Sequence, residues 1–241
     1  MSWDWQVFLT DDGSGRTYLE WMIQAWGWTL SVAACAWVLS VSVGVVVGTL
    51  RTVTKYPILV LCGNIWVEVF RNVPILVQVF LWYFVLPKIF PPMQHWSGFV
   101  LVVLALGFFT SSRIAEQVKA GINALPRGQA MASLALGLTP LQSYRYVILP
   151  MALRIILPPL TSESMNLLKN SSVAFAVSIP ELTMFAMQAQ EETSRGIEIY
   201  LAVTFLYAVS AFAVNRLMAM LERSLQIPGT VPLAASTSGG H

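Results

Sequence analysis

The residues best suited to chemistry are polar side chains that recur inside apolar stretches of the chain. Within residues 150–177, four of them follow helical spacing: Glu163, Asn166, Lys169 and Asn170. Positions i, i+3, i+6 and i+7 share one face of a helix, so they predict a polar stripe, which Ser171 and Ser172 extend. A carboxylate and an ammonium group on one stripe can line a path for a charged solute, or they can pair and only fix packing. The spacing leaves both interpretations open.

A second polar group lies within residues 56–87. Glu68 and Arg71 are spaced i, i+3 and are expected to pair with each other. Asn72 and Pro74 follow, and a proline removes a backbone donor and breaks or kinks a helix. An ionisable side chain at the centre of a bilayer costs roughly 3 kcal/mol or more, so it is expected to face the bundle interior or a water-filled cavity. Broken helices are tolerated at membrane depth where they line such a cavity.

The composition excludes several classes of protein. Of the 241 residues, 56% are hydrophobic and 11% are charged, whereas soluble domains carry about 25% charged residues. Cys35 and Cys62 lie singly in apolar runs, without the spacing of a disulfide framework or a metal site. The chain has no glycine-rich phosphate-binding loop, so it is not expected to hydrolyse ATP or to hold a cofactor itself. Its basic residues are too scattered for nucleic acid, and its serines lack a histidine that could act as a base.

A transmembrane helix needs about 20 mainly apolar residues, and five apolar segments can supply all or most of one each. They lie within residues 21–50, 56–87, 89–112, 150–177 and 199–215. The fold class is therefore expected to be an all-α membrane protein with five transmembrane helices. Lysine and arginine gather after the first, third and fifth segments, whereas acidic residues gather on the other side. The positive-inside rule then places the N-terminus in the periplasm and the C-terminus in the cytosol.

This orientation divides the chain into three parts. A periplasmic N-terminal segment, a transmembrane domain and a disordered cytosolic tail are expected at residues 1–20, 21–225 and 226–241. Residues 180–194 predict a short helix on the periplasmic surface, because proline suits a first turn; an ordinary connecting loop is the alternative. Arg113 and Glu116, spaced i, i+3 at the cytosolic end of the third span, predict a local structural pair.

The segment at residues 127–150 is unusual for a cytosolic connection. Its beginning, residues 127–136, predicts a short and nearly uncharged helix. Gly137 suits the left-handed position just after a helix, and Thr139 with Pro140 suits the start of the next one. An apolar helix on the surface needs a partner. A helix lying flat on the membrane is the alternative, but such helices usually have a basic face that this one lacks, so docking to a partner protein is favoured.

The sequence MASLALG, followed nine residues later by VILP, resembles the cytoplasmic loop of bacterial ABC-importer permeases. That loop has the pattern EAA, then glycine, then I-x-LP, and the corresponding residues here are Ala132, Gly137, Val147, Leu149 and Pro150. The glutamate of the pattern is Met131 in this chain, and its second alanine is Ser133. The resemblance implies a coupling helix that sits in a groove of an ATPase subunit. The residues expected to make that contact are Ala132, Ser133, Ala135, Gly137 and Leu138.

The resemblance extends beyond this loop. VEVFRNVPILVQVFLWYFVLP and LPPLTSESMNLLKNSSVAFAVSIPEL resemble the second and fourth spans of polar amino-acid importer permeases. From about Tyr18 to Pro228, the chain resembles a permease subunit of the bacterial glutamate/aspartate importers. This implies an ABC type I importer transmembrane domain in the bacterial inner membrane. The implied partners are a second homologous permease, two ATPase subunits that bind ATP and Mg²⁺, and a periplasmic amino-acid-binding protein.

The two polar groups together form the candidate substrate path: Glu68, Arg71, Asn72, Glu163, Asn166, Lys169, Ser171 and Ser172. An amino acid carries both charges, so the path needs a cation, Arg71 or Lys169, and an acceptor, Glu163. The sequence leaves open which amino acid is carried and whether the two permeases are identical. A self-contained secondary carrier or channel is the alternative, although such carriers usually have more spans, often as two repeats.

Overall fold

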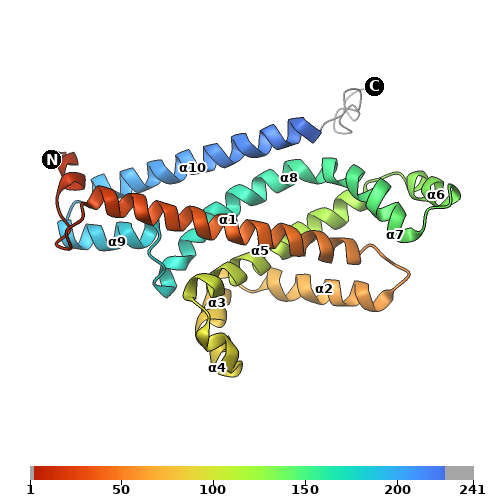
Figure 1. Cartoon of the computed structure of the whole chain (residues 1–241), viewed down its shortest axis with the longest axis horizontal. Coiled ribbons are helices and arrows are strands. Elements are labelled where there is room, and N and C mark those ends of the chain that lie inside the picture. Colours follow the sequence, from red (N-terminus) through yellow and green to blue (C-terminus); the bar gives the residue numbers. More distant parts are fainter. Residues whose placement is uncertain (1–2, 226–241) are drawn as a thin grey trace, which may run out of the picture.

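A computed structural model describes residues 3–225, and this part of the chain consists of helices joined by short connections (Figure 1). The β-structure within it is an isolated bridge between Asp11 and Thr17. The all-α class predicted from the sequence is therefore confirmed for the described residues. The predicted tail at residues 226–241 lies outside them.

Three helices are long and apolar enough to cross a membrane: α1 (Tyr18–Leu50), α5 (Gly98–Asn123) and α10 (Gly196–Leu225). A capping box begins α1, because the Thr17 hydroxyl accepts the backbone N–H of Glu20, whose carboxylate accepts the backbone N–H of Thr17. At the start of α5, the Ser97 hydroxyl accepts the N–H of Val100. These side chains bond N–H groups that the first turn leaves free, so local sequence defines where both helices begin.

Two further segments are bent pairs of helices. The first pair is α2 (Pro57–Asn72), bent by 104° from a run of α3 (Ile75–Phe80), the π-helix η2 (Leu81–Val85) and α4 (Leu86–Ile89). The second is a run of α7 (Pro140–Ser143), the π-helix η4 (Tyr144–Ile148), α8 (Leu149–Asn170) and the 3₁₀-helix η5 (Ser171–Val177), bent by 53° from α9 (Leu182–Thr193). The described residues thus hold three spanning helices, or five if each bent pair is one span.

The break after α2 falls at Val73 and Pro74, where the sequence predicts it. The Gln78 side chain supports this break from inside the bundle. Its Nε2 donates to the carbonyl oxygens of Phe70 at 2.7 Å and Val73 at 3.1 Å, and the residue is only 2% exposed. Beyond the break, α3 still packs against α5, and α4 projects sideways from the bundle (Figure 1). One buried amide therefore replaces hydrogen bonds that lipid cannot supply.

The shorter elements are η1 (Trp5–Leu9), η3 (Pro91–His95) and α6 (Arg127–Ala135). The last of these corresponds to the short helix predicted at residues 127–136. Gly137 follows it with φ +84°, and a capping box between Thr139 and Gln142 begins α7. The helix predicted within residues 180–194 is also confirmed, as α9, and the alternative of an irregular loop is wrong.

The N-terminal segment is held to the bundle by charged side chains. The Asp4 carboxylate lies 3.1 Å from the Arg195 guanidinium, which precedes α10. Asp12 bonds to the Ser14 hydroxyl and to Arg16, and these bonds lower the pKa of its carboxyl group to about 2. Asp12 therefore stays ionised well below neutral pH, and its ion pair with Arg16 closes the turn.

The helices α1 and α5 pack side by side through small residues on α1: Ala36, Ser40, Gly44 and Gly48. Four-residue spacing places all of them on one face. A Cβ atom on Gly44 would lie 2.6 Å from Ile114 Cγ2, and one on Gly48 would lie 2.6 Å from Val118 Cβ. Glycine is therefore required for this close approach, as in other membrane helix pairs.

We predict that Gly44→Leu destabilises the protein by about 1–3 kcal/mol or more, because the added side chain overpacks the α1–α5 contact. Gly27→Leu is the matched control, since a Cβ on Gly27 meets no atom within 4 Å. The measurement is the melting temperature of the detergent-solubilised protein, followed by size-exclusion chromatography. Equal melting temperatures for the two variants would contradict the packing argument.

Candidate functional site

One turn of α5 carries a cluster of charged and amide side chains, which follows the apolar first half of the helix. Arg113, Glu116 and Gln117 are spaced i, i+3 and i+4, so they share one face. This face lies between α2 on one side and α8 on the other, and the side chains reach partners on both. The polar turn of α5 is therefore the centre of the candidate site.

Toward α8, Arg113 and Glu163 form a bidentate ion pair. Arg113 Nε donates to Glu163 Oε2 at 2.8 Å, and Arg113 Nη2 donates to Glu163 Oε1 at 3.0 Å. Gln117 Nε2 adds a third bond to Glu163 Oε1 at 3.2 Å. Glu163 is 5% exposed, whereas the Arg113 side chain is 45% exposed. A buried carboxylate thus anchors a half-exposed guanidinium group.

Toward α1 and α2, Glu116 joins two arginines. Arg51 Nη2 donates to Glu116 Oε1 at 2.8 Å, and Arg51 Nε donates to Asn64 Oδ1 at 2.8 Å. Arg71 Nη1 lies 3.5 Å from the same Glu116 oxygen. Arg51 is 7% exposed, so it depends on these partners inside the protein, although its Nη1 is buried without a hydrogen-bond partner among the described residues.

The network continues along α2 to the break at Pro74. Arg71 Nη2 lies 3.4 Å from Glu68 Oε1, and Asn72 Nδ2 donates to Glu68 Oε2 at 2.6 Å. The pair that the spacing of Glu68 and Arg71 predicts is therefore present. Both side chains remain exposed, at 60% and 45%.

One expected ion pair, and one pair that the sequence left open, do not form within the described residues. Arg113 does not pair with Glu116, because each side chain reaches a different neighbouring helix. Glu163 does not pair with Lys169, which is exposed and has no ion-pair partner within residues 3–225. Helical spacing shows which residues share a face, but the partner across the face depends on which helix packs there.

The remaining predicted path residues differ in their access to the surface. Asn166 and Ser172 are half-buried, and Asn72 is exposed. Ser171 is fully buried and donates to the carbonyl oxygen of Leu168 at 2.7 Å, so its hydroxyl is unavailable to a solute. Sequence reasoning did not assign Arg113, Gln117 or the buried Arg51 to this site. Their only signal was a charged or amide side chain within or beside an apolar segment.

The arrangement is suited to binding a charged solute rather than to covalent chemistry. Exposed charged side chains on apolar helices must face water or protein at membrane depth, because lipid does not solvate them. Both signs of charge are present on the face formed by α2, α5 and α8. Among the described residues, no group of His, Cys, Asp and Glu could hold a metal ion.

A second candidate surface is the short helix α6. Its exposed apolar side chains are Met131, Leu134 and Leu136, at 70%, 50% and 84%. Ala132, Ala135 and Gly137 are exposed and Leu138 is half-buried, as a docking role allows. Ser133 is only 3% exposed and hydrogen-bonds to Ser143. Ser133 thus links α6 to α7 of the same chain, and the larger apolar side chains form most of the surface of α6 that is free to dock.

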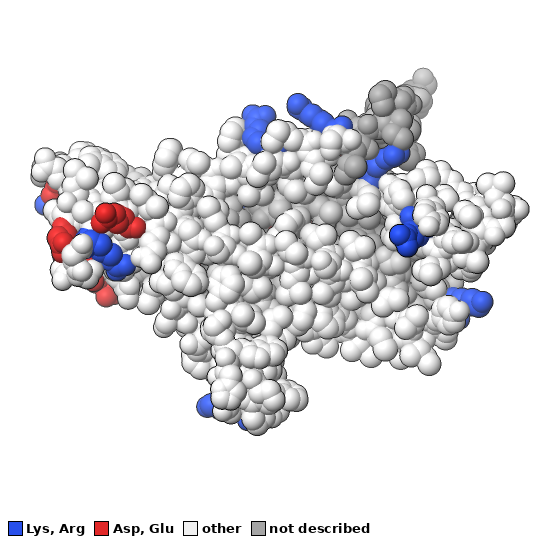
Figure 2. All heavy atoms as spheres, in the orientation of Figure 1, with Lys and Arg blue, Asp and Glu red and all other residues white. Residues whose placement is uncertain are grey.

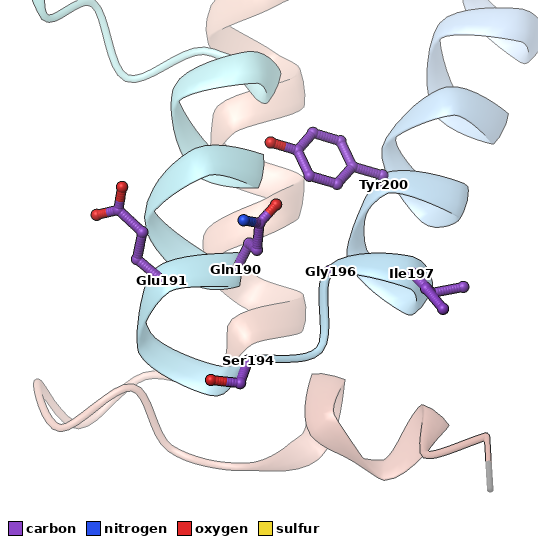
Figure 3. Close-up of a pocket in the computed structure, with 6 residues that line it drawn as sticks. All are labelled: Gln190, Glu191, Ser194, Gly196, Ile197 and Tyr200. Atoms are coloured by element: carbon purple, nitrogen blue, oxygen red, sulfur yellow. The ribbon is translucent and has the colours of Figure 1, made fainter. Parts of the chain in front are cut away.

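A shallow depression of about 720 Å³ lies between α9 and α10 (Figure 3). Its lining residues are Gln190, Glu191, Ser194, Gly196, Ile197 and Tyr200. In Figure 3, Gln190 points toward α10, whereas Glu191 points away from it. The neighbouring Glu192 accepts a hydrogen bond from the Tyr18 hydroxyl at 2.9 Å. Of these two adjacent carboxylates, Glu191 is the freer one.

Comparison with known proteins shows similarity over most of the chain. A family described as binding-protein-dependent transport system inner membrane component matches residues 40–227. The glutamate/aspartate import permease protein GltJ of Escherichia coli (strain K12) is 38% identical over 242 residues, which cover 96% of this chain and 98% of that protein. The probable glutamine ABC transporter permease protein GlnP of Bacillus subtilis (strain 168) is 31% identical over 202 residues, which cover 84% of this chain and 90% of that protein.

Solved structures show the same fold. A chain in the crystal structure of an amino acid ABC transporter with histidines has a TM-score of 0.75 and 29% identity, and the match covers 93% of this chain and all of that one (100%). A chain of the inward-facing MetNI methionine ABC transporter has a TM-score of 0.77 at 19% identity, and the match covers 90% of this chain and 100% of that one. At that lower identity the likeness concerns the fold alone.

Proposed function

Since the chain belongs to the family of binding-protein-dependent transport system inner membrane components, we propose that it moves L-glutamate and L-aspartate along the polar face of α2, α5 and α8. It is a multi-pass inner membrane protein and a permease subunit of an ABC amino-acid importer. The identity of the substrates, L-glutamate and L-aspartate, is what we propose beyond this family role. Their main support is the 38% identity to a glutamate/aspartate permease over nearly the whole chain.

The charges on the polar face agree with acidic substrates. Four cations lie on or beside it: Arg51, Arg71, Arg113 and Lys169. Three carboxylates accompany them: Glu68, Glu116 and Glu163. The three arginines are ion-paired to the three carboxylates, so the exposed Lys169 adds positive charge beyond these pairs, which favours a solute with an excess of carboxylate groups. No observation on the described residues favours the alternative of a self-contained carrier.

The distribution of charge supports the proposed orientation. Figure 2 shows acidic side chains near the N-terminal segment and α9, whereas the rest of the visible face carries only lysine and arginine. With α6 in the cytosol, the positive-inside rule is satisfied. We propose five spans, with each bent pair of helices crossing once and the N-terminus in the periplasm.

The proposed assembly contains a second homologous permease, two ATPase subunits and a periplasmic binding protein. The ATPases bind ATP and Mg²⁺, and this chain docks to one of them through α6. The exposed Met131, Leu134 and Leu136 suit an apolar groove. The binding protein contacts the opposite end of the molecule, where α9 presents Glu191 and the depression beside it.

The substrate proposal is tested by ATP-dependent uptake into proteoliposomes that contain the complete transporter and its binding protein. We expect uptake of labelled L-glutamate and L-aspartate. Excess unlabelled L-glutamine or L-arginine is expected not to compete, because neither has a second carboxylate. Strong competition by either amide or cationic amino acid would contradict acidic specificity.

For the coupling surface, we predict that Leu136→Asp lowers ATP hydrolysis stimulated by the loaded binding protein at least about tenfold. An unpaired carboxylate buried in an apolar groove costs more than the 1.4 kcal/mol that corresponds to a factor of ten. Met131→Glu is the matched control on the same helix, because the resembling pattern has glutamate at this position. Normal stimulation of the Leu136→Asp transporter would remove Leu136 from the ATPase interface.

For the periplasmic surface, we predict that Glu191→Lys raises the concentration of binding protein that half-saturates ATPase stimulation severalfold at low salt. The effect should shrink as salt increases, because exposed charges are screened. Glu192→Gln is the control, since the amide oxygen of glutamine can still accept the hydrogen bond from the Tyr18 hydroxyl. Equal half-saturation for wild type and Glu191→Lys at low salt would place the docking surface elsewhere.

A further inference from the structure

We infer that Arg113 binds a carboxylate of the transported amino acid, and that Glu163 is the positioning residue that orients it. This inference rests on the proposed function, because it takes the polar face of α2, α5 and α8 to line the path. It reverses the roles suggested by sequence spacing, in which Glu163 accepts the substrate ammonium group and Arg113 only fixes packing. The hydrogen bonds of the two side chains carry the argument.

Glu163 has little capacity left for a substrate, because three hydrogen bonds already occupy its carboxylate group. Its Oε2 accepts from Arg113 at 2.8 Å, and its Oε1 accepts from Arg113 at 3.0 Å and from Gln117 at 3.2 Å. At 5% exposure it is also shielded from the surface. An ammonium group that took the place of Arg113 on this carboxylate would leave the arginine without its partner.

Arg113 has the opposite properties. Its Nε and Nη2 atoms bond to Glu163, whereas Nη1 has no hydrogen-bond partner in the part of the chain that the structure describes. Its side chain is 45% exposed. A guanidinium group is planar and presents its donors in a rigid fork, so fixing one edge also fixes the direction of the other. The free edge of Arg113 is therefore held ready for a carboxylate, which arginine binds with charge-assisted hydrogen bonds.

The other cations of the face are less suited to this role. Arg51 is 7% exposed and bonds to Glu116 and Asn64. Arg71 lies between two carboxylates, 3.4 Å from Glu68 and 3.5 Å from Glu116. Lys169 is exposed on the neighbouring helix α8, but no ion pair orients its flexible side chain. Lys169 can add attraction for an anion, whereas Arg113 combines its exposure with a short bidentate pair that fixes its geometry.

The test separates substrate binding from a packing role by exchanging the two charged residues, which keeps an ion pair but reverses its direction. The variants are Arg113→Lys and the exchange of Arg113→Glu with Glu163→Arg, each in the complete transporter. Arg216→Lys is the control, because Arg216 is exposed on α10 beside the Phe212 ring, 4.7 Å from its centroid. Two quantities are measured: L-glutamate uptake into proteoliposomes, and equilibrium binding of L-glutamate to the assembled complex without binding protein.

We expect Arg113→Lys to weaken L-glutamate binding about tenfold, because lysine keeps the charge but loses the fork. The exchanged pair should assemble yet lose uptake about 100-fold or more, since a carboxylate then faces the substrate. Arg216→Lys should match wild type. Wild-type uptake by the exchanged pair would show that the pair only fixes packing and overturn the inference.

If the exchanged pair fails to assemble, the binding constant of Arg113→Lys decides, and an unchanged value overturns the inference. A wild-type complex that takes up no L-glutamate would instead refute the proposed function, and this role of Arg113 with it. Normal wild-type uptake together with unaffected Arg113 variants refutes only the present inference. The two failures are thus distinguishable.

Discussion

Glu163 lies inside the helix bundle at 5% exposure, with both carboxylate oxygens bonded to Arg113. An ionised carboxylate is tolerated at such a position only if its partners compensate for the water it has lost. This requirement fixes how α5 and α8 are rotated against each other. Once Arg113 faces α8, Glu116 on the same α5 turn is directed to α1 and α2, where Arg51 and Arg71 meet it. This pair, through its buried carboxylate, therefore organises the charges of three neighbouring helices.

The other side of α5 is organised by size rather than charge. Gly44 and Gly48 let α1 approach so closely that a Cβ on either would lie 2.6 Å from an α5 side chain. Beside this contact, Gln78 holds the break at Pro74, where the apolar run of α3 and α4 is bent by 104° from α2. Together these features leave the polar turn of α5 accessible between α2 and α8, as a path for a charged solute requires.

The proposed cytosolic contact is mechanically close to this path. Ser133 hydrogen-bonds to Ser143, so α6 is attached directly to the end of α7. The helical run of α7, η4 and α8 then continues to Glu163 and Asn170. A displacement of α6 by an ATPase subunit would therefore act on the helix that carries the buried carboxylate. One continuous element connects the docking surface with the polar face.

The sequence by itself determined the features that have local causes. Gly137 ended α6 and Pro74 broke the second membrane segment, because backbone conformation at glycine and proline depends mainly on the residue itself. Motif order was also enough to indicate the family. Only the tertiary structure decided the partners of the charges, since Arg113 meets Glu163 across 50 residues of sequence. It likewise turned Ser133 inward. Helical spacing shows which side chains share a face, whereas long-range packing decides what lies opposite that face.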